Sequence, residues 1–252
     1  MAAKKRIDQL LMERGYAQSR QKAQALLMAG VVLVGQRKVE KPGTRVDTDA
    51  DVRVLGRLPF VSRAGGKLQA GLDHFKIPVA GRICADLGSS TGGFTDCLLQ
   101  NGAIEVHTFD VGRGQIAWKI RTDPRVVVHD GFNVRYISSS DLPENIAVVT
   151  ADLSFISLTK ILVPLKEALL PQLSDSGGDL ILLVKPQFEA AKGEVGKGGV
   201  IRCEKKQVQI LRSVEVFAEK NGYLVKGSLP SPILGAKGNR EFLLYLQLPT
   251  SL

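Results

Sequence analysis

Acidic residues end four apolar segments of this sequence, at positions where they could reach one pocket. The segments RICADLG, EVHTFDVG, VVVHDG and AVVTADLS carry them, and the residues are Asp86, Asp110, Asp130 and Asp152. If these segments are strands of one open parallel sheet, their carboxyl ends meet at the edge where such sheets bind ligands. Carboxylate oxygens accept hydrogen bonds and attract cations, so they suit a ligand with sugar hydroxyls, an exocyclic amine and a cationic group.

Two lysines and a glutamate could make this pocket an active site. Lys67 lies on a predicted helix at 66–74, Lys185 follows the apolar run LILLV, and Glu241 precedes the last such run. If the last strand is antiparallel to the others, it begins where they end, and these three side chains converge with Asp152. A lysine in such a place can act as a general base if burial and neighbouring charges bring its pKa to about 7–8. Taken alone, each residue would more often be a surface ion-pair partner. That interpretation explains the placement of all of them at one edge less well than a shared active site does.

The loop after Asp86 has the composition of a cofactor-binding turn. It reads DLGSSTGGFT, and its glycines permit a tight turn and the close approach of a ligand. The G-x-G-x-x-G pattern of nicotinamide-binding loops is absent, so NAD is not expected. The loop resembles motif I of the S-adenosylmethionine-dependent methyltransferases, which implies that Asp110 holds the ribose hydroxyls and that Asp130 lies beside the adenine amine. It assigns the other contacts with S-adenosyl-L-methionine to Asp86, Gly88, Ser89, Gly92, Gly93, Phe94 and Asp152.

From residue 62 onward, apolar runs alternate with amphipathic segments in the order of a doubly wound α/β domain. Five strands are expected near 82–87, 105–110, 125–129, 146–152 and 179–185, with helices at 66–74, 95–101, 158–170 and 204–221. Two last strands are expected near 223–229 and 241–248. The predicted fold class is therefore α/β, a doubly wound, Rossmann-like sheet of seven strands whose last strand is antiparallel.

A small basic unit precedes this domain. Residues 1–57 hold twelve lysines and arginines against six acidic residues, within a chain of net charge +9. Two helices, the second from Ser19 to Gly30, precede the short predicted strands VVLVG and VRVLG. So short a unit buries little apolar surface and is an appended module, with residues 58–61 as its linker to 62–252. Its charge suggests a polyanion partner such as nucleic acid, although an ordinary solvated basic surface would carry the same charge.

The segment from RIDQLL to KP resembles the S4 RNA-binding domain over nearly its whole length. Arg6, Asp8, Ser19 and Arg20 are among the matching positions, and Val34 departs from the usual Asn or Asp before the turn glycine. The resemblance implies a small α+β domain that presents basic side chains to the phosphates of structured RNA. Those side chains are Arg6, Arg20, Lys22, Lys41 and Arg63. The alternative is a helical hairpin whose basic faces contact protein.

The order of Lys67, Asp152, Lys185 and Glu241 resembles the FtsJ-like ribose 2′-O-methyltransferases. With the N-terminal module, the chain resembles the TlyA-type ribosomal RNA methyltransferases, which are also called hemolysin A. The segments VSRAGGKL, DVGRGQ, ADLSFIS, LVKPQFE, KGGVIR and GAKGNREF carry this resemblance. It implies methyl transfer from S-adenosylmethionine to ribose 2′-hydroxyls, with cytidine of 16S and/or 23S ribosomal RNA as target and ribosomal RNA or ribosomal subunits as partners. It makes all four residues catalytic and assigns the role of base to Lys185.

Two other functions stay open: a membrane-active hemolysin, and an RNA-binding assembly factor with an inactive methyltransferase fold. The longest aliphatic run, Leu180 to Val184, is far shorter than the roughly 20 residues of a membrane-spanning helix. The first residues lack the apolar core of a signal peptide, so a cytoplasmic protein without a membrane partner is expected. The three cysteines have no metal or redox spacing and the three histidines are scattered, so no metal site is predicted.

Overall fold

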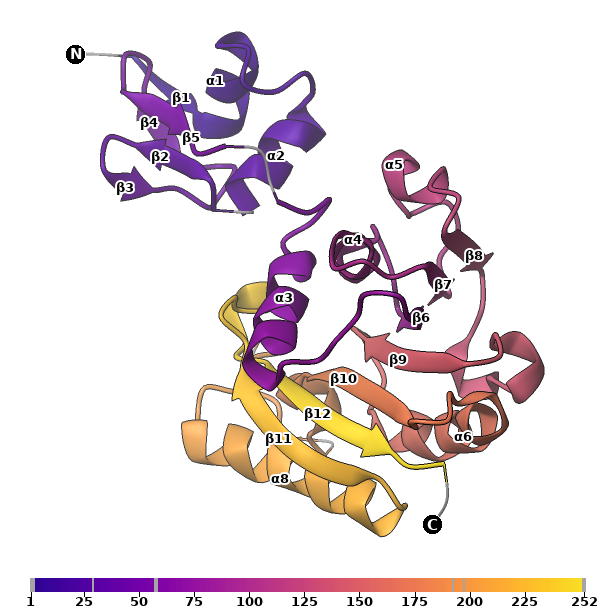
Figure 1. Ribbon diagram of the computed structural model, residues 1–252. Helices are drawn as coiled ribbons and strands as arrows, with labels where there is room; N and C mark the ends of the chain where they lie inside the picture. Colours follow the sequence, from indigo (N-terminus) through magenta and orange to yellow (C-terminus); the bar gives the residue numbers. More distant parts are fainter. Residues whose placement is uncertain (1–2, 29, 57–58, 192, 197, 251–252) are drawn as a thin grey trace. The chain divides into compact units, whose positions relative to one another are not determined.

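The computed structural model describes residues 3–28, 30–56, 59–191, 193–196 and 198–250. The chain divides between Arg63 and Ala64 into two compact units (Figure 1). Each unit has a hydrophobic core of its own. The predicted linker at 58–61 lies just before that division, and its Leu58 is outside the described residues.

The first unit packs two helices on two small sheets. Strand β1 (Lys4–Arg6) pairs with β4 (Arg45–Asp47), and β2 (Val32–Val34) lies between β3 (Arg37–Lys38) and β5 (Val52–Val54). Helix α1 (Ile7–Glu13) and helix α2 (Arg20–Met28) share one buried apolar cluster with these strands. The α2 helix begins after Ser19, whose hydroxyl oxygen accepts a hydrogen bond from the Lys22 amide at 3.2 Å and so caps the helix.

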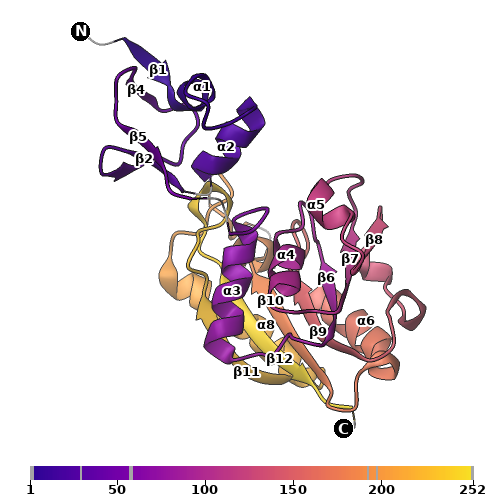
Figure 2. The same ribbon diagram turned by 45° about the horizontal axis from the view of Figure 1, so that its top comes forward.

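The second unit is built on one seven-stranded sheet (Figure 2). Its strands are, in spatial order, β11 (Leu224–Pro230), β12 (Phe242–Leu248), β10 (Gly178–Val184), β9 (Ile146–Ala151), β6 (Ile83–Leu87), β7 (Glu105–Asp110) and β8 (Val126–Asp130). Strand β12 is antiparallel to both of its neighbours, and the pairs among β10, β9, β6, β7 and β8 are parallel. The predicted doubly wound α/β sheet with an antiparallel last strand is therefore confirmed.

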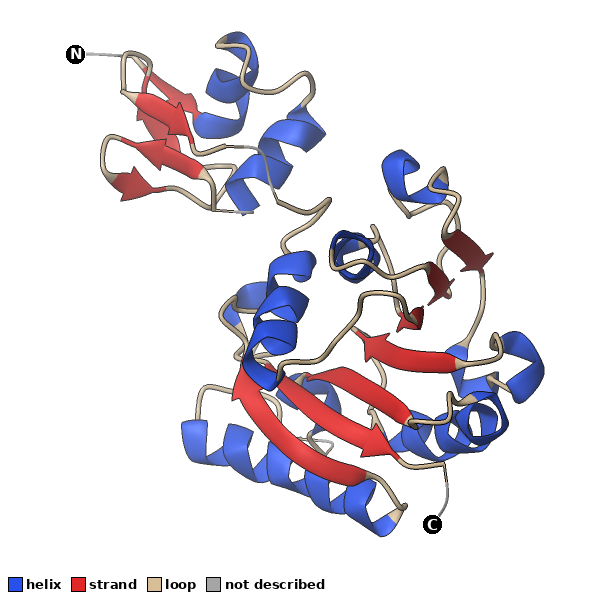
Figure 3. Ribbon diagram, viewed as in Figure 1, coloured by secondary structure: helices blue, strands red, loops and turns tan. Residues whose placement is uncertain are grey.

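Helices cover both faces of this sheet. On one face α3 (Ala64–Phe75) packs beside α4 (Gly93–Gln100), and on the other α6 (Thr159–Leu169) packs beside α8 (Glu204–Lys220) (Figure 3). Two short helices, α5 (Trp118–Arg121) and α7 (Pro186–Glu189), follow β7 and β10. The 3₁₀ turns are Val134–Tyr136, Ser139–Asp141, Leu170–Gln172 and Ala236–Gly238. Within the described ranges, no helix has both the length and the apolar character that crossing a membrane requires.

The register of the strands places the catalytic candidates at one edge of the sheet. Val184 of β10 is paired with Phe242 of β12, so Lys185 and Glu241, the next residues outward, extend from the same end. Asp152 follows the last residue of the parallel strand β9 at that end. Helix α3 packs on β12 and brings its own side chains to this edge.

Candidate active site

Lys185 stands at the end of β10 and is held by two oxygen atoms. Its Nζ lies 2.6 Å from Asp152 Oδ1 and donates a hydrogen bond to Ser154 Oγ at 3.0 Å. The residue is only 8% exposed, and the centre of the Phe188 ring lies 5.9 Å from Nζ. Once two of its directions are taken by fixed acceptors, a lysine nitrogen has one left for a further partner.

A second, more deeply buried ion pair joins α3 to β12. Lys67 Nζ lies 2.6 Å from Glu241 Oε2, and the two residues are 5% and 3% exposed. The Glu241 carboxylate packs on Gly235, where an added Cβ would lie 1.8 Å from Oε1, so a larger residue there would have to displace the carboxylate. The structure thus places the four predicted catalytic residues at one edge of the sheet as two ion pairs, Lys185 with Asp152 and Lys67 with Glu241.

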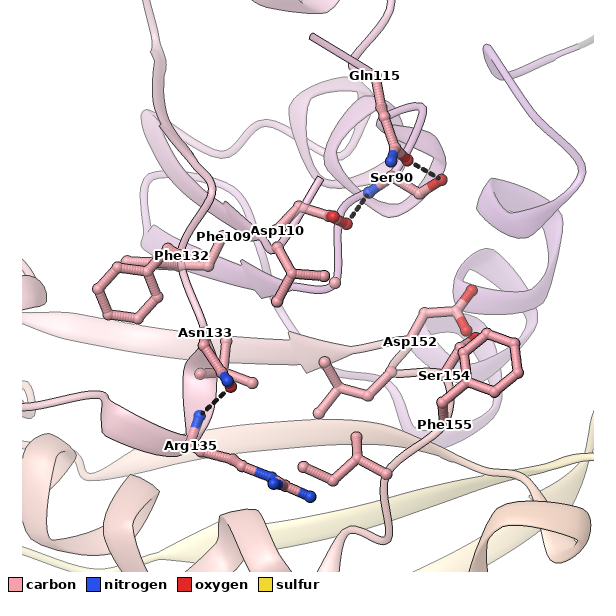
Figure 4. A pocket seen from close by; sticks show the side chains of 15 residues that line it. Ser90, Phe109, Asp110, Gln115, Phe132, Asn133, Arg135, Asp152, Ser154 and Phe155 are labelled. Carbon is pink, nitrogen blue, oxygen red and sulfur yellow. Dashed lines mark hydrogen bonds between the residues drawn. The ribbon is translucent and has the colours of Figure 1, made fainter. Parts of the chain in front are cut away.

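A pocket of about 500 Å³ shares residues with the first of these pairs (Figure 4). Asp152 and Ser154 line it together with Asp110, which ends β7, and with Gly88 and Ser90 of the loop after β6. Its apolar walls come from Phe109, Val111, Phe132, Val134, Leu153, Phe155 and Ile156. Apolar walls with a few placed polar groups are typical of a cofactor or substrate site.

The Asp110 carboxylate is fixed by two backbone amides. Its Oδ2 accepts a hydrogen bond from Ser90 N at 2.8 Å, and its Oδ1 accepts one from Gly112 N at 2.7 Å. Each carboxylate oxygen has a further lone pair, so the side chain can still accept hydrogen bonds from hydroxyls in the pocket. Gly88, which has a φ of +81°, crosses so close to Asp152 that an added Cβ would lie 2.9 Å from its carbonyl oxygen.

Asp86 lies behind the glycine-rich loop and is not among the described residues that line the pocket. Its carboxylate is fully buried and accepts hydrogen bonds from Thr95 Oγ1 of α4 at 2.6 Å and from Thr150 Oγ1 of β9 at 3.1 Å. Burial raises the pKa of the Asp86 carboxyl to about 7, although both hydroxyls oppose that shift. Asp86 therefore ties α4 to the sheet beneath the pocket.

Asp86→Asn should change how the stability of the protein depends on pH. The folded protein holds the Asp86 proton up to about pH 7, whereas an unfolded aspartate loses it near pH 4. Between those values Asp86 is protonated in the folded state and ionised in the unfolded state. The free energy of unfolding therefore falls by about 1.4 kcal/mol for each unit of rising pH. Urea titrations across this window should show the free energy of unfolding falling with pH in the wild type and staying more nearly constant in the variant. Parallel curves for the two proteins would show that Asp86 titrates like an ordinary aspartate.

Four other loop residues of the predicted cofactor site hold the turn. Ser89, Gly92, Gly93 and Phe94 are not among the described residues that line the pocket. Gly92 has a φ of +89° and donates its amide hydrogen to the Ser89 carbonyl at 2.7 Å. Gly93 begins α4, and Phe94 is buried. These residues shape the loop that faces the pocket.

Asp130 is held by another partner at the end of β8. It forms an ion pair with Arg121 and accepts a hydrogen bond from Gly114 N at 3.2 Å. Arg121 holds the pKa of Asp130 below its usual range. From the same strand end, Phe132 and Asn133 line the pocket instead of Asp130 in the part of the chain that the structure describes.

Ser154 is a site residue that the sequence interpretation missed. It follows Asp152 by two positions in the segment ADLSFIS, and it touches both Lys185 and the pocket. The one signal for it is its place two residues after a strand-end carboxylate.

In the first unit, Arg6 and Arg20 converge on the buried carboxylate of Asp8. Arg6 Nε and Nη2 donate to Asp8 at 3.0 and 2.8 Å, and Arg20 Nε donates at 3.2 Å. The Arg6 hydrogen bonds hold the pKa of Asp8 well below its usual range. Asp8 thus holds the guanidinium groups of Arg6 and Arg20 close to one another. The other predicted RNA-binding residues are exposed or half-exposed side chains, Lys22, Lys41 and Arg63.

Comparison with known proteins agrees with this architecture. A model of the FtsJ-like methyltransferases matches residues 60–248, and a model of the S4 domain matches residues 5–52. The chain is 46% identical to the Bacillus subtilis protein named "Putative rRNA methyltransferase YqxC", over 98% of this chain and 86% of that one. It is 40% identical to the "16S/23S rRNA (cytidine-2'-O)-methyltransferase TlyA" of Mycobacterium tuberculosis, over 99% of this chain and 92% of that one.

A solved structure agrees over the whole chain. The structure titled "Putative hemolysin from Streptococcus thermophilus" superposes with a TM-score of 0.75 at 38% identity, covering 100% of this chain and 90% of that one. Both predicted resemblances, to the S4 domain and to the FtsJ-like enzymes, are confirmed by these matches. The chain therefore belongs to the FtsJ-like methyltransferases, in the TlyA-type group that joins this catalytic domain to an S4 domain.

Proposed function

We propose that this methyltransferase transfers a methyl group from S-adenosylmethionine to ribose 2′-hydroxyls of ribosomal RNA, with cytidine in 16S and/or 23S RNA as the target. The observation that carries the proposal is the position of Lys185, whose Nζ is held by Asp152 and Ser154, two residues that line the pocket. A base there would stand beside a bound methyl donor, within reach of the hydroxyl it must deprotonate. The relative named for this reaction is 40% identical in sequence to this chain, in an alignment that covers 99% of this chain.

The residues around the pocket fit S-adenosylmethionine. When bound, this cofactor supplies a methyl group on a positively charged sulfur. Asp110, held by two amides, would accept hydrogen bonds from the ribose hydroxyls, and Gly88 would let the backbone approach closely. Phe132 and Asn133 would meet the adenine, while Asp152 would face the positive charge. The remaining predicted cofactor residues would hold the pocket from behind: Asp86, Ser89, Gly92, Gly93, Phe94 and Asp130.

Lys185 would remove the proton of the acceptor hydroxyl. Asp152 and Ser154 take two hydrogen-bond directions of its nitrogen, which leaves one direction for the hydroxyl. The buried pair of Lys67 and Glu241 would position the acceptor ribose at the same edge, because it presents a fixed donor and a fixed acceptor.

The first unit would hold the RNA. Arg6 and Arg20, fixed on Asp8, form a cation pair suited to backbone phosphates, and Lys22, Lys41 and Arg63 would add further phosphate contacts. This assigns most of the RNA docking to the first unit, which ends at Arg63, and the chemistry to the second unit.

Asp110→Ala should weaken the binding of S-adenosylmethionine by roughly 1–3 kcal/mol, through loss of hydrogen bonds to the ribose. Calorimetry on the purified full-length protein measures this directly. Asp175→Ala removes an aspartate that does not line the described pocket, so it should bind the cofactor as the wild type does. An unchanged affinity in the Asp110 variant would remove that residue from the site.

The proposed activity is tested with ribosomal subunits prepared from cells that lack the modification. The full-length protein is incubated with the subunits and S-adenosylmethionine carrying a labelled methyl group. The label should enter RNA. Label recovered only in ribosomal protein, or no transfer to subunits or to free ribosomal RNA, would contradict the proposal.

A further inference from the structure

A second pocket, of about 360 Å³, lies between the start of α8 and the loop that leads into β12. Three cationic side chains line it, Arg202 from the segment before α8 and Lys237 and Arg240 from the loop. Glu204 is the one carboxylate among the described lining residues, and it forms an ion pair with Arg240. Among the residues that the structure describes, Arg202 and Lys237 have no hydrogen-bond or ion-pair partner, so the pocket holds unsatisfied positive charge.

Buried polar side chains hold the walls of this pocket. Asn239, which is 3% exposed, accepts a hydrogen bond from Ile201 N at 3.2 Å and donates one to the Gly199 carbonyl at 2.9 Å. Gln207, also buried, donates to the Ile201 carbonyl at 2.6 Å. Lys237 has a φ of +58°, a left-handed conformation that costs a non-glycine residue roughly 1–3 kcal/mol and is typical of functional loops. The cations are therefore presented by a braced loop.

The same loop reaches the catalytic edge. Arg240 directly precedes Glu241, and Leu234, another lining residue, precedes the Gly235 that packs on the Glu241 carboxylate. The loop that lines this pocket thus also contacts the Glu241 carboxylate of the buried ion pair with Lys67.

We propose that this pocket binds a backbone phosphate of the substrate RNA, on a nucleotide near the acceptor ribose. The inference rests on the proposed function, since it deepens the description of the same substrate. A phosphate suits the pocket because arginine meets its oxygens with paired N–H groups and lysine adds a point charge. Such a contact sets the position of the strand and carries no sequence information.

Arg202→Ala and Lys237→Ala test the proposal in the full-length protein, with Lys205→Ala as the matched control. Lys205 is an exposed lysine in the first turn of α8 that does not line the described pocket. Binding to ribosomal RNA and to polyuridylate is measured at equilibrium over a range of salt, without methyl transfer. Each pocket variant should bind both RNAs about threefold to tenfold more weakly, with a salt slope reduced by about 1. Glu204→Gln should bind more tightly, because it frees Arg240.

Cofactor affinity and thermal stability should stay at wild-type values in all of these variants. Pocket variants that bind RNA like the wild type, or that lose no more than the Lys205 control, would overturn the proposal. Because binding alone is measured, a protein that methylates a base could still keep this phosphate site. Equally, if ribose methylation is confirmed but RNA binding is unaffected in these variants, the phosphate site is contradicted and the proposed function is not.

Discussion

Lys185→Ala should slow methyl transfer by about 10²–10⁴-fold, the usual effect of removing a general base. Among the described residues, Lys185 is the cation whose Nζ is held by both Asp152 and Ser154, two residues of the pocket wall, so the substitution removes the proposed base. Binding should survive, because Lys185 itself is not among the described residues that line the pocket. Single-turnover transfer of a labelled methyl group, with RNA and cofactor affinities measured beside it, separates chemistry from binding.

Two further variants sharpen this result. Lys185→Arg should remain slow, because guanidinium stays protonated and cannot accept the hydroxyl proton. Ser154→Ala should give a smaller loss than Lys185→Ala, since it removes one support of the lysine and leaves the base in place. A Lys185→Ala enzyme within a few-fold of the wild type would assign the base to water or to another group.

Lys67→Met should lower the free energy of unfolding by roughly 3–5 kcal/mol, because it leaves the Glu241 carboxylate buried without its partner. The two groups are 2.6 Å apart and nearly inaccessible to solvent. Adding Glu241→Gln to Lys67→Met should restore most of that stability, since no unpaired charge is then buried. It should not restore methyl transfer, because the pair that positions the acceptor is still missing.

Urea unfolding of the wild type, both single variants and the double variant measures the coupling between Lys67 and Glu241. The exposed pair of Lys5 and Glu13 supplies the control, since its atoms are 2.8 Å apart but both side chains are more than a third exposed. Lys5→Met should cost less than about 1 kcal/mol. Independent, additive effects of the Lys67 and Glu241 changes would show that the buried pair contributes no coupling.

The fold of the second unit could be predicted closely from the sequence because its strands are long apolar runs. The strand expected near 179–185 is observed as Gly178–Val184, and the helix expected at 204–221 as Glu204–Lys220. In the first unit, strands such as β1 and β3 contain three and two residues, too few to show an alternating pattern. Their pairing depends on the packing of α1 and α2, which the local sequence does not encode.

The candidate site could be predicted only as far as strand ends indicate it. Lys185 and Glu241 each adjoin a long apolar run, so their common edge follows from topology. Asp86 and Asp130 adjoin such runs as well, yet their carboxylates are held by threonine hydroxyls in one case and by Arg121 in the other. Those partners come from other elements, and no motif spacing identifies them. Asn133, which lines the pocket, was missed for a different reason: it lies beyond the strand end rather than at it.

The position of the transferred methyl group tests the central claim most directly. A methyl group on the ribose 2′-oxygen blocks alkaline cleavage of the adjoining phosphodiester, because that cleavage needs a free 2′-hydroxyl. Ribosomal RNA labelled by the wild-type enzyme should therefore yield its label in alkali-resistant dinucleotides that contain 2′-O-methylcytidine, and the Lys185→Ala enzyme should yield almost none. Label released by alkali as a base-methylated mononucleotide would contradict ribose methylation and the catalytic roles proposed for Lys67, Asp152, Lys185 and Glu241.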